Sequence, residues 1–255
     1  MNKIEVQHYK KVKLENIIFY KPTENTFDLK NYISKCRYVG KDNNKKKFFI
    51  QTPKLKIDSD LVYDKITNSF KFDCLFSKKQ PEFYNFFYSF EKFLIGHIAK
   101  NSEKWFGIKF DKSKTEKLFR SKILPPEYLS SLPKLLLDIK IIDGSINCKF
   151  FDEYDKLTTA DKFTKGKETI FILSLNEIIF EEDNFYANWK INQIKIFENQ
   201  VNKNKYMFID DENISDEETE YIYDIIDSEI KDSLSEMSNI VSNPITKNIP
   251  KDQII

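Results

Sequence analysis

An Asp-Gly pair separates two runs of alternating apolar residues, and this pattern constrains the fold more than any other stretch of the sequence. Before Asp143 and Gly144 the apolar positions are Leu135, Leu137, Ile139 and Ile141, and after them Ile146, Cys148 and Phe150. Asp-Gly suits a two-residue turn in which both residues take positive φ. The pattern therefore predicts an antiparallel hairpin over residues 134–150.

A second alternating pair follows a polar connection that contains Gly166. The alternating residues are Thr169, Phe171, Leu173 and Leu175 on the first strand and Phe185, Ala187, Trp189 and Ile191 on the second. A polar tip at residues 181–184 lies between the two strands. Further strands are predicted at residues 48–53, 61–63 and 70–76. Short strands joined by turns leave exposed edges unless they are closed or covered. We therefore expect a mainly β fold, an antiparallel sheet closed into a small barrel.

Residues 81–98 have a different period. Phe83, Phe87, Phe90 and Leu94 recur at steps of three and four after Pro81, which predicts one long amphipathic helix inserted between the strands. Such a stripe is far more often core than a base-stacking surface. We expect this helix to plug the barrel. His97 lies on its apolar face, where we expect a packed core residue and not a ligand.

The composition indicates an intracellular, reducing compartment. The three cysteines, Cys36, Cys74 and Cys148, are scattered, and the chain has two histidines, so neither a disulfide framework nor a metal site is predicted. No signal peptide or apolar run long enough to span a membrane is recognisable. We expect no membrane partner and no cofactor.

Charge is distributed unevenly along the chain. The chain has 41 basic and 40 acidic residues. Residues 206–255 contain 3 of the basic and 13 of the acidic residues, which leaves 38 basic and 27 acidic residues in residues 1–205. The net charges of these two parts are therefore −10 and +11. A basic body suggests a polyanionic partner, although a lysine-rich surface also follows from the Lys, Asn and Ile bias of an AT-rich genome.

We predict three parts: a basic N-terminal arm or extra strands at 1–47, a core at 48–200 and an acidic C-terminal tail at 201–255. Dense charge without a core-forming pattern predicts a disordered tail. It could simply confer solubility, or it could fold onto the basic body and compete with nucleic acid. The tail residues that we select as partner-binding are Asp216, Glu217, Glu218, Tyr221 and Tyr223.

Catalytic motifs are not recognisable. The sequence lacks a phosphate-binding glycine loop, a GxSxG elbow and an HExxH pair, so we expect no enzyme. The best enzyme candidate is a metal-dependent nuclease that uses Asp73, Asp138 and Lys140 on adjacent strands, but the D-x-K pattern that carries it is very weak. An outward strand face explains the same residues.

Binding chemistry suits the sequence better. A basic surface with aromatic rings on which bases stack is typical of sequence-tolerant single-strand binding. Phe185 and Trp189 share a strand face, so Tyr186 and the tip residue Phe180 are the better candidates for exposure. The candidate nucleic-acid-binding residues are Phe180, Tyr186, Trp189, Lys190, Lys195, Lys140, Lys149, Lys71, Lys109 and Arg120.

The order of these segments resembles the single-stranded DNA-binding proteins of T-odd phage replisomes, and more closely their counterparts in large nucleocytoplasmic DNA viruses. The resemblance covers residues 45–200. It lies in residues 70–76, the long helix, Lys149–Asp152, Gly166-Lys167 and residues 189–197. It implies an OB-fold-like barrel with an inserted helix, a cleft for single-stranded DNA, and an acidic tail that contacts replication proteins. The positions that correspond to the family's DNA contacts are Phe180, Tyr186, Lys190 and Lys149. The family's phage members end in an acidic run closed by an aromatic residue, whereas here the neutral residues 238–255 follow the acids.

These observations predict a protein that coats single-stranded DNA in viral replication, recombination or repair, in the host cytoplasm or a viral factory, and that could form homo-oligomers. The alternative from another class is a virion or scaffold protein.

Overall fold

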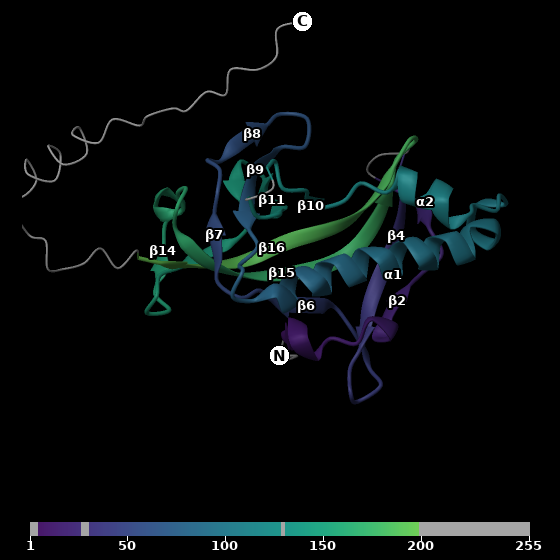
Figure 1. Ribbon diagram of the computed structural model, residues 1–255, viewed down its shortest axis with the longest axis horizontal. Helices are drawn as coiled ribbons and strands as arrows, with labels where there is room; N and C mark the ends of the chain where they lie inside the picture. The colour runs from purple at the N-terminus through teal and green to yellow at the C-terminus, as the bar shows by residue number, and fades with distance from the viewer. Residues whose placement is uncertain (1–4, 27–30, 129–130, 199–255) are drawn as a thin grey trace, which may run out of the picture. The chain divides into compact units, whose positions relative to one another are not determined.

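The computed structural model describes residues 5–26, 31–128 and 131–198, all within one compact unit that comprises residues 1–199. The predicted acidic tail lies outside the described residues. The described chain is mainly β with one long helix (Figure 1). Its strands are β1 (Gln7–His8), β2 (Ile17–Phe19), β3 (Thr23–Glu24), β4 (Tyr32–Val39), β5 (Lys45–Lys46), β6 (Phe48–Gln51), β7 (Leu55–Ile57), β8 (Val62–Asp64), β9 (Ser69–Leu75), β10 (Ile123–Leu124), β11 (Lys134–Ile142), β12 (Ser145–Ile146), β13 (Lys149–Phe151), β14 (Leu157–Thr158), β15 (Glu168–Phe180) and β16 (Phe185–Phe197). Its helices are α1 (Pro81–Phe106) and α2 (Lys112–Leu118), with short 3-10 turns η1 (Tyr9–Lys11), η2 (Leu14–Asn16) and η3 (Ala160–Lys162).

The β15–β16 hairpin is the centre of the sheet. Each strand has 13 residues, and their pairing runs from Glu168 opposite Phe197 to Phe180 opposite Phe185. On its other edge β15 pairs with β4, β6 and β7. The predicted hairpin is confirmed, and it is longer than the sequence pattern indicated. Because the N-terminal β4 pairs with β15, the N-terminal residues extend the same sheet.

The predicted Asp-Gly turn is also confirmed. Asp143 and Gly144 have φ values of 50° and 74°, and they join β11 to β12. The returning strand is shorter than expected, however, because it ends at Ile146. Phe150 lies instead on β13, which pairs in parallel with β16.

The sheet is open, so the prediction of a closed antiparallel barrel is wrong. The path of paired strands runs β10-β11-β9-β7-β15-β16-β13-β14 without returning to β10. Residues 119–124 lie between β11 and β16, where direct pairing would have closed the barrel. An isolated bridge joins Phe119 to Phe185, and the Leu136 amide donates a hydrogen bond to the Lys122 carbonyl at 2.8 Å. Two strand pairs, β1–β6 and β13–β16, are parallel.

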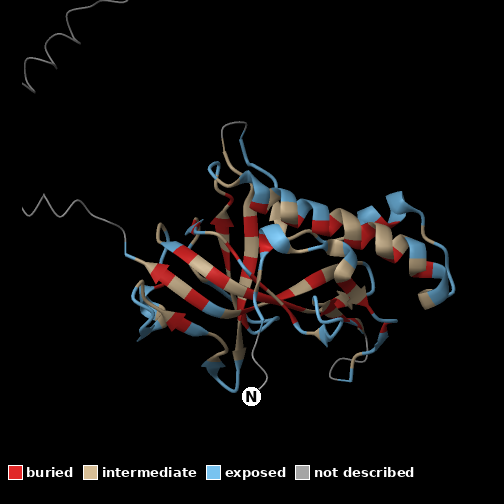
Figure 2. Cartoon of the chain, turned by 90° about the horizontal axis from the view of Figure 1, so that it is seen from below, coloured by how far each residue is buried: buried red, intermediate tan, exposed pale blue. Residues whose placement is uncertain are grey.

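Helix α1 forms where the apolar period predicted it and continues to Phe106. Pro81 occupies its first turn, and Gly107 caps its C-terminal end with a φ of 71°, which suits a residue without Cβ. Its buried stripe packs on one face of the sheet, where the rings of Phe87 and Phe90 lie 5.3 and 5.2 Å from the ring of Trp189. Figure 2 shows this buried stripe along the helix, with exposed residues on its opposite side. The helix therefore covers a sheet face and does not plug a closed barrel.

A second group of rings fills the space between β9, β13 and β15. Phe163 lies 4.9 Å from Phe72, 6.1 Å from Phe150 and 6.2 Å from Phe171, all between ring centroids. Burying large aromatic side chains of this kind stabilises a fold by roughly 1.5–3 kcal/mol each. These two groups make the inner face of β15 and β16 mainly apolar, with Thr169 as a buried polar residue on it, and the polar side chains of β16 lie on the outer face.

Neither described helix has an apolar stretch long enough to cross a bilayer. All three cysteines are free: Cys36 and Cys74 are buried, and Cys148 is half-buried.

Candidate nucleic-acid interface

Strand β16 separates apolar from polar side chains along its whole length. Its inward residues pack in the core, whereas its outward residues are half-buried or exposed and include two rings and two lysines. We call these outward residues the β16 strip: Tyr186, Asn188, Lys190, Asn192, Gln193, Lys195 and Phe197.

A β-bulge keeps the strip on one face. Ile172 pairs with Gln193 but Leu173 pairs with Ile191, so Asn192 is an extra residue in β16. The Asn192 amide is held by a hydrogen bond to the Ser174 hydroxyl at 2.9 Å. An inserted residue shifts the alternation by one. The even-numbered residues before the bulge and the odd-numbered residues after it therefore point to the same, outward face. Without the bulge, Lys195 would face the core.

Tyr186 and Arg120 form one end of the strip. The guanidinium carbon of Arg120 lies 4.0 Å from the Tyr186 ring centroid, and one guanidinium nitrogen lies 3.6 Å from a Glu181 carboxylate oxygen. The Arg120 amide donates a hydrogen bond to the Phe185 carbonyl at 2.9 Å, which fixes the backbone beside the ring. Burial raises the pKa of Tyr186 to about 12, so its ring remains neutral at ordinary pH.

Glu91 of α1 holds the segment that carries Arg120. One oxygen of its buried carboxylate accepts a hydrogen bond from the Ser121 hydroxyl at 2.7 Å, and the other accepts one from the Lys122 amide at 2.9 Å. Burial raises the pKa of Glu91, partly offset by these hydrogen bonds. Residues 120–122 therefore hydrogen-bond to the helix as well as to the sheet.

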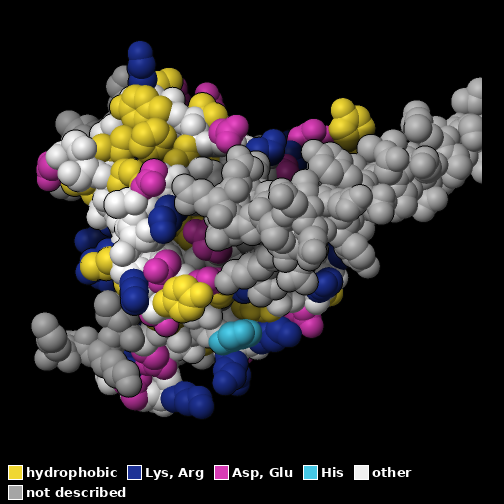
Figure 3. Space-filling view, turned by 90° about the vertical axis from the view of Figure 1, so that its left-hand side faces the viewer, with side chains coloured by type: hydrophobic (Ala, Val, Ile, Leu, Met, Phe, Trp, Pro, Cys, Tyr) yellow, Lys and Arg dark blue, Asp and Glu magenta, His cyan; other side chains and the backbone are white. Residues whose placement is uncertain are grey.

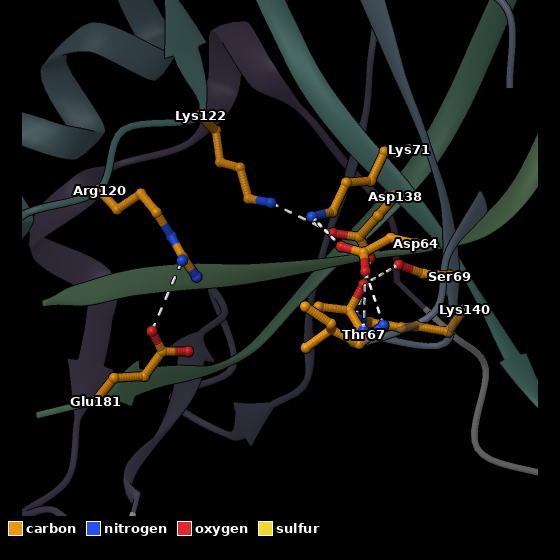
Figure 4. Close-up of polar contacts among 10 residues, drawn as sticks. Asp64, Thr67, Ser69, Lys71, Arg120, Lys122, Asp138, Lys140 and Glu181 are labelled. Carbon is orange, nitrogen blue, oxygen red and sulfur yellow. Dashed lines mark hydrogen bonds and ion pairs between the residues drawn. The ribbon is translucent and has the colours of Figure 1, made fainter. Parts of the chain in front are cut away.

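Three lysines lie beside this segment on β9, on β11 and just before β10 (Figure 4). The amino groups of Lys122 and Lys140 lie 3.3 and 3.5 Å from Asp138, and Lys71, opposite Asp138 on β9, pairs with Asp64. Burial lowers the pKa of Lys122. With Arg120, they form what we call the cationic cluster: Lys71, Arg120, Lys122 and Lys140. Lys71 and Arg120 keep 43% and 54% of their side chains exposed, so both can reach a phosphate.

The other end of the strip is Phe197. The amino group of Lys54 lies 3.8 Å from the centroid of the Phe197 ring, and the amino group of Lys195 lies 5.7 Å from it. A hollow of about 330 Å³ lies beside it, lined by outward residues of β15 and β16 together with Gln51, Phe151 and Asp155. Lys195 also pairs with Asp155 at 2.7 Å. This end therefore combines a ring with two cations, as the Tyr186 end combines a ring with one.

Two predicted contact residues are corrected. Trp189 is 2% exposed because its ring lies among Phe48, Phe87 and Phe90, so it offers no face to a ligand. Phe180 is 9% exposed, because the end of α1 packs on the hairpin tip and brings Phe106 to 5.3 Å from it. The expectation that Phe180 projects into solvent is wrong.

Of the remaining predicted lysines, two lie on or beside the strip and one does not. Lys190 lies within the strip, and Lys149 is exposed on β13 opposite Gln193, beside it. Lys109 is exposed on the connection between α1 and α2 and is not part of the strip. The five tail residues, Asp216, Glu217, Glu218, Tyr221 and Tyr223, lie outside the described residues.

On the uncovered part of the face in Figure 3, Lys and Arg side chains are interspersed with Asp and Glu. The uncovered part of that face therefore shows no continuous basic patch.

The two aspartates of the nuclease alternative make different contacts. The backbone N–H of Asp73 donates a hydrogen bond to the Ser59 hydroxyl, whereas the Asp138 carboxylate pairs with Lys122 and Lys140. Burial raises the pKa of Asp73. Among the described residues, no cluster of three side chains of the metal-binding types is present.

The sequence prediction missed Phe197 and Lys54, and it left Lys122 outside the selected set. The alternation in residues 185–191 could have been continued to Phe197, but the bulge at Asn192 breaks the period. Lys54 lies on a different strand connection, and no local pattern relates it to Phe197.

No family model matches this chain, and no curated protein matches it. Among solved structures, the single-stranded DNA-binding protein gp2.5 of bacteriophage T7 aligns with a TM-score of 0.43 and 10% identity, over 66% of this chain and 98% of that one. The single-stranded DNA-binding protein of bacteriophage Enc34 in complex with ssDNA aligns with a TM-score of 0.42 and 7% identity, over 71% of this chain and 96% of that one. Both belong to the class that the sequence resembles, but a likeness this distant assigns neither function nor residues.

Proposed function

We propose that this chain binds single-stranded DNA along the β16 strip, without chemistry of its own. The observation that supports this is the pairing of ring and cation at both ends of one strand face, Tyr186 with Arg120 and Phe197 with Lys54 and Lys195. Lys190 lies between them on the same face. Stacking rings alternating with phosphate-binding cations are the features of sequence-tolerant single-strand binding.

The length of the strip fits several nucleotides. From Tyr186 to Phe197 the strand spans roughly 36 Å at about 3.3 Å per residue. Cations distributed along this length can neutralise several phosphates, and each neutralised phosphate releases counterions. Binding is therefore expected to weaken steeply as the salt concentration rises.

Existing ion pairs reduce the affinity of individual cations. Arg120 pairs with Glu181, and Lys195 with Asp155, so a phosphate has to displace a carboxylate at each site. Exposed pairs of this kind contribute only about 0–1 kcal/mol, so the exchange costs little.

The test is fluorescence anisotropy with a labelled oligo(dT) over a salt series. We expect the double substitution Lys190→Glu with Lys195→Glu to abolish binding at moderate salt. The charge-matched control is Lys100→Glu with Lys104→Glu, two exposed residues of α1, which covers the opposite face of the sheet. Equal loss in both variants would show that binding is diffuse, and the strip would then have no special role. A virion or scaffold subunit is expected to retain the oligonucleotide only weakly and without dependence on its length.

The acidic segment 206–255 is proposed to compete with DNA for the basic body and to contact replication proteins through its Asp, Glu and Tyr residues. Its net charge of −10 opposes the +11 of residues 1–205. Removing residues 206–255 is expected to raise the affinity for oligo(dT) and to change its salt dependence. Unchanged affinity and salt dependence would contradict the proposed competition.

A further inference from the structure

A cavity of about 610 Å³ lies at the tip of the β15–β16 hairpin, which the nucleic-acid interface described above does not include. It is bounded by the hairpin and by the end of α1 with the residues that follow it. Its apolar lining includes Phe106, Phe110, Phe180, Phe185, Ile98 and Leu118. This volume is typical of sites that enclose small molecules.

The aromatic walls suit a flat ring. Phe180 and Phe185 are stacked with centroids 5.6 Å apart and planes inclined by 27°, and Phe106 meets Phe180 edge-on at 5.3 Å. Phe106 and Phe110 form a further stacked pair at 6.3 Å. Phe180, although largely buried, thus contributes to a cavity wall. Aromatic rings in such arrangements bind another ring by stacking or by edge contact.

The polar part of the lining comprises Tyr32 of β4, Glu181, Glu182 and Asn184, and the two carboxylates among them are acceptors only. Glu181 is paired with Arg120, whereas Glu182 forms no ion pair with another described residue. The Asn184 Oδ1 is shielded from solvent and has no hydrogen-bond partner in the described part of the chain. An acceptor left unpartnered costs about 1–3 kcal/mol, so rotating this amide towards a ligand breaks no hydrogen bond of its Oδ1 and gains one.

A ligand for this cavity must be flat and must present donors to the two acceptors. Carboxylates at the rim repel phosphate, so a nucleotide can enter only by its base. Arg120, which pairs with Glu181, and Lys114, whose amino group lies 4.6 Å from the Phe110 ring centroid, remain for the phosphates outside. The cationic cluster is continuous with the cavity through Arg120 and Glu181.

We propose that the tip cavity takes one unstacked base of the bound strand and prefers guanine. This inference rests on the proposed function, since it requires DNA beside Arg120. Guanine presents adjacent N1–H and N2–H donors, which one carboxylate accepts together. Adenine and cytosine present only an amino group, and thymine presents one N–H between two carbonyl oxygens that Glu182 repels. The preference is therefore guanine first and thymine last.

The experiment compares labelled dT12 with dT12 that carries a single central dG, dA, dC or deoxyinosine, by anisotropy with the full chain. A bidentate base contact gives about 1–3 kcal/mol of discrimination, so we expect the dG oligonucleotide to bind at least about fivefold more tightly than dT12. Deoxyinosine, which lacks the N2 amino group, is expected to fall between them.

The variant is Glu182→Gln, and its matched control is Asp183→Asn, a neighbouring tip carboxylate that does not line the cavity. Both remove one negative charge, so both are expected to strengthen binding to dT12 to the same extent. Only Glu182→Gln is expected to abolish the dG preference. If the wild-type chain binds dT12 without a dG preference, or if Glu182→Gln retains it, the cavity inference is overturned while the strip is unaffected. If no oligonucleotide binds at all, the proposed function itself fails.

Discussion

The guanidinium carbon of Arg120 lies 4.0 Å from the centroid of the Tyr186 ring, across the gap between β11 and β16. The two residues are 66 positions apart and meet because residues 119–124 bridge the sheet edges. A stacked guanidinium holds the ring in place and leaves its own charge exposed for a phosphate. This pair joins the two functions of the proposed interface, base stacking and charge neutralisation.

Replacing Tyr186 tests the stacking function. Tyr186→Ala is expected to weaken oligo(dT) binding by about 1–3 kcal/mol, the value typical of one stacked base. Tyr186→Phe should bind like the wild type, because the aromatic ring stacks on the base. The hydroxyl group, with a pKa of about 12, is neutral in both the free and the bound protein at ordinary pH. Anisotropy titrations of the three proteins check this. If the Ala and Phe variants weaken binding alike, the hydroxyl group, and not the ring face, makes the contact.

Alternation in the sequence predicted much of this arrangement. It placed Tyr186 opposite in direction to Phe185 and Trp189, and it placed the turn at Asp143 and Gly144. Both are local consequences of the two-residue period of a strand. The burial of Trp189 follows from the same pattern, which argues against its inclusion among the ligand-binding residues.

The errors involve contacts between distant segments. Phe180 is buried because Phe106, 74 positions earlier, packs on it. β11 and β16 do not pair directly, because residues 119–124 lie between them and Phe119 bridges to Phe185. The bulge at Asn192 concealed Phe197 from a period-two analysis. Neither a hairpin tip nor a bulge carries a sequence signal strong enough to specify what packs against it.

Lys190 tests the electrostatic function at the middle of the strip. Lys190→Ala is expected to make the slope of log Kd against log salt shallower by about 0.7, the contribution of one phosphate on a single strand. The control Lys100→Ala, on exposed α1, should leave the slope unchanged. Titrations at four or more salt concentrations provide the measurement. An unaltered slope with Lys190→Ala would remove this lysine from the interface.

Glu91 is expected to make folding stability depend on pH. Burial raises its pKa in the folded chain, so folding favours the protonated carboxyl group. Below the unfolded pKa this contribution is fully present, and it is lost as the pH rises through the folded pKa. The wild type should therefore lose stability relative to Glu91→Gln as the pH rises from about 4 towards neutral, starting near the usual glutamate pKa of about 4.3. Urea unfolding of both proteins across this range measures the difference, and parallel curves would contradict it.

Glu91 should also affect DNA binding through position. Glu91→Ala leaves the Lys122 amide without its acceptor, at a cost of about 1–3 kcal/mol for an unsatisfied buried group. The Ser121 hydroxyl can still donate to the Ile123 carbonyl at 3.1 Å. Because Lys122 belongs to the cationic cluster and Arg120 precedes Ser121, we expect weaker oligo(dT) binding by the folded variant. Glu91→Gln keeps an amide oxygen as acceptor and should bind more nearly like the wild type. Equal binding by all three would mean that the segment is held without Glu91.

Trp189 separates a core role from a ligand-binding role. Its ring packs against Phe48, Phe87 and Phe90, so Trp189→Ala is expected to destabilise the fold by about 3–5 kcal/mol. Trp189→Phe should cost less, because it retains a ring between α1 and the sheet. Urea unfolding gives both values, and oligo(dT) titration of folded Trp189→Phe should give wild-type affinity. A variant with normal stability and weakened binding would place this ring in contact with DNA, contrary to its burial between the helix and the sheet.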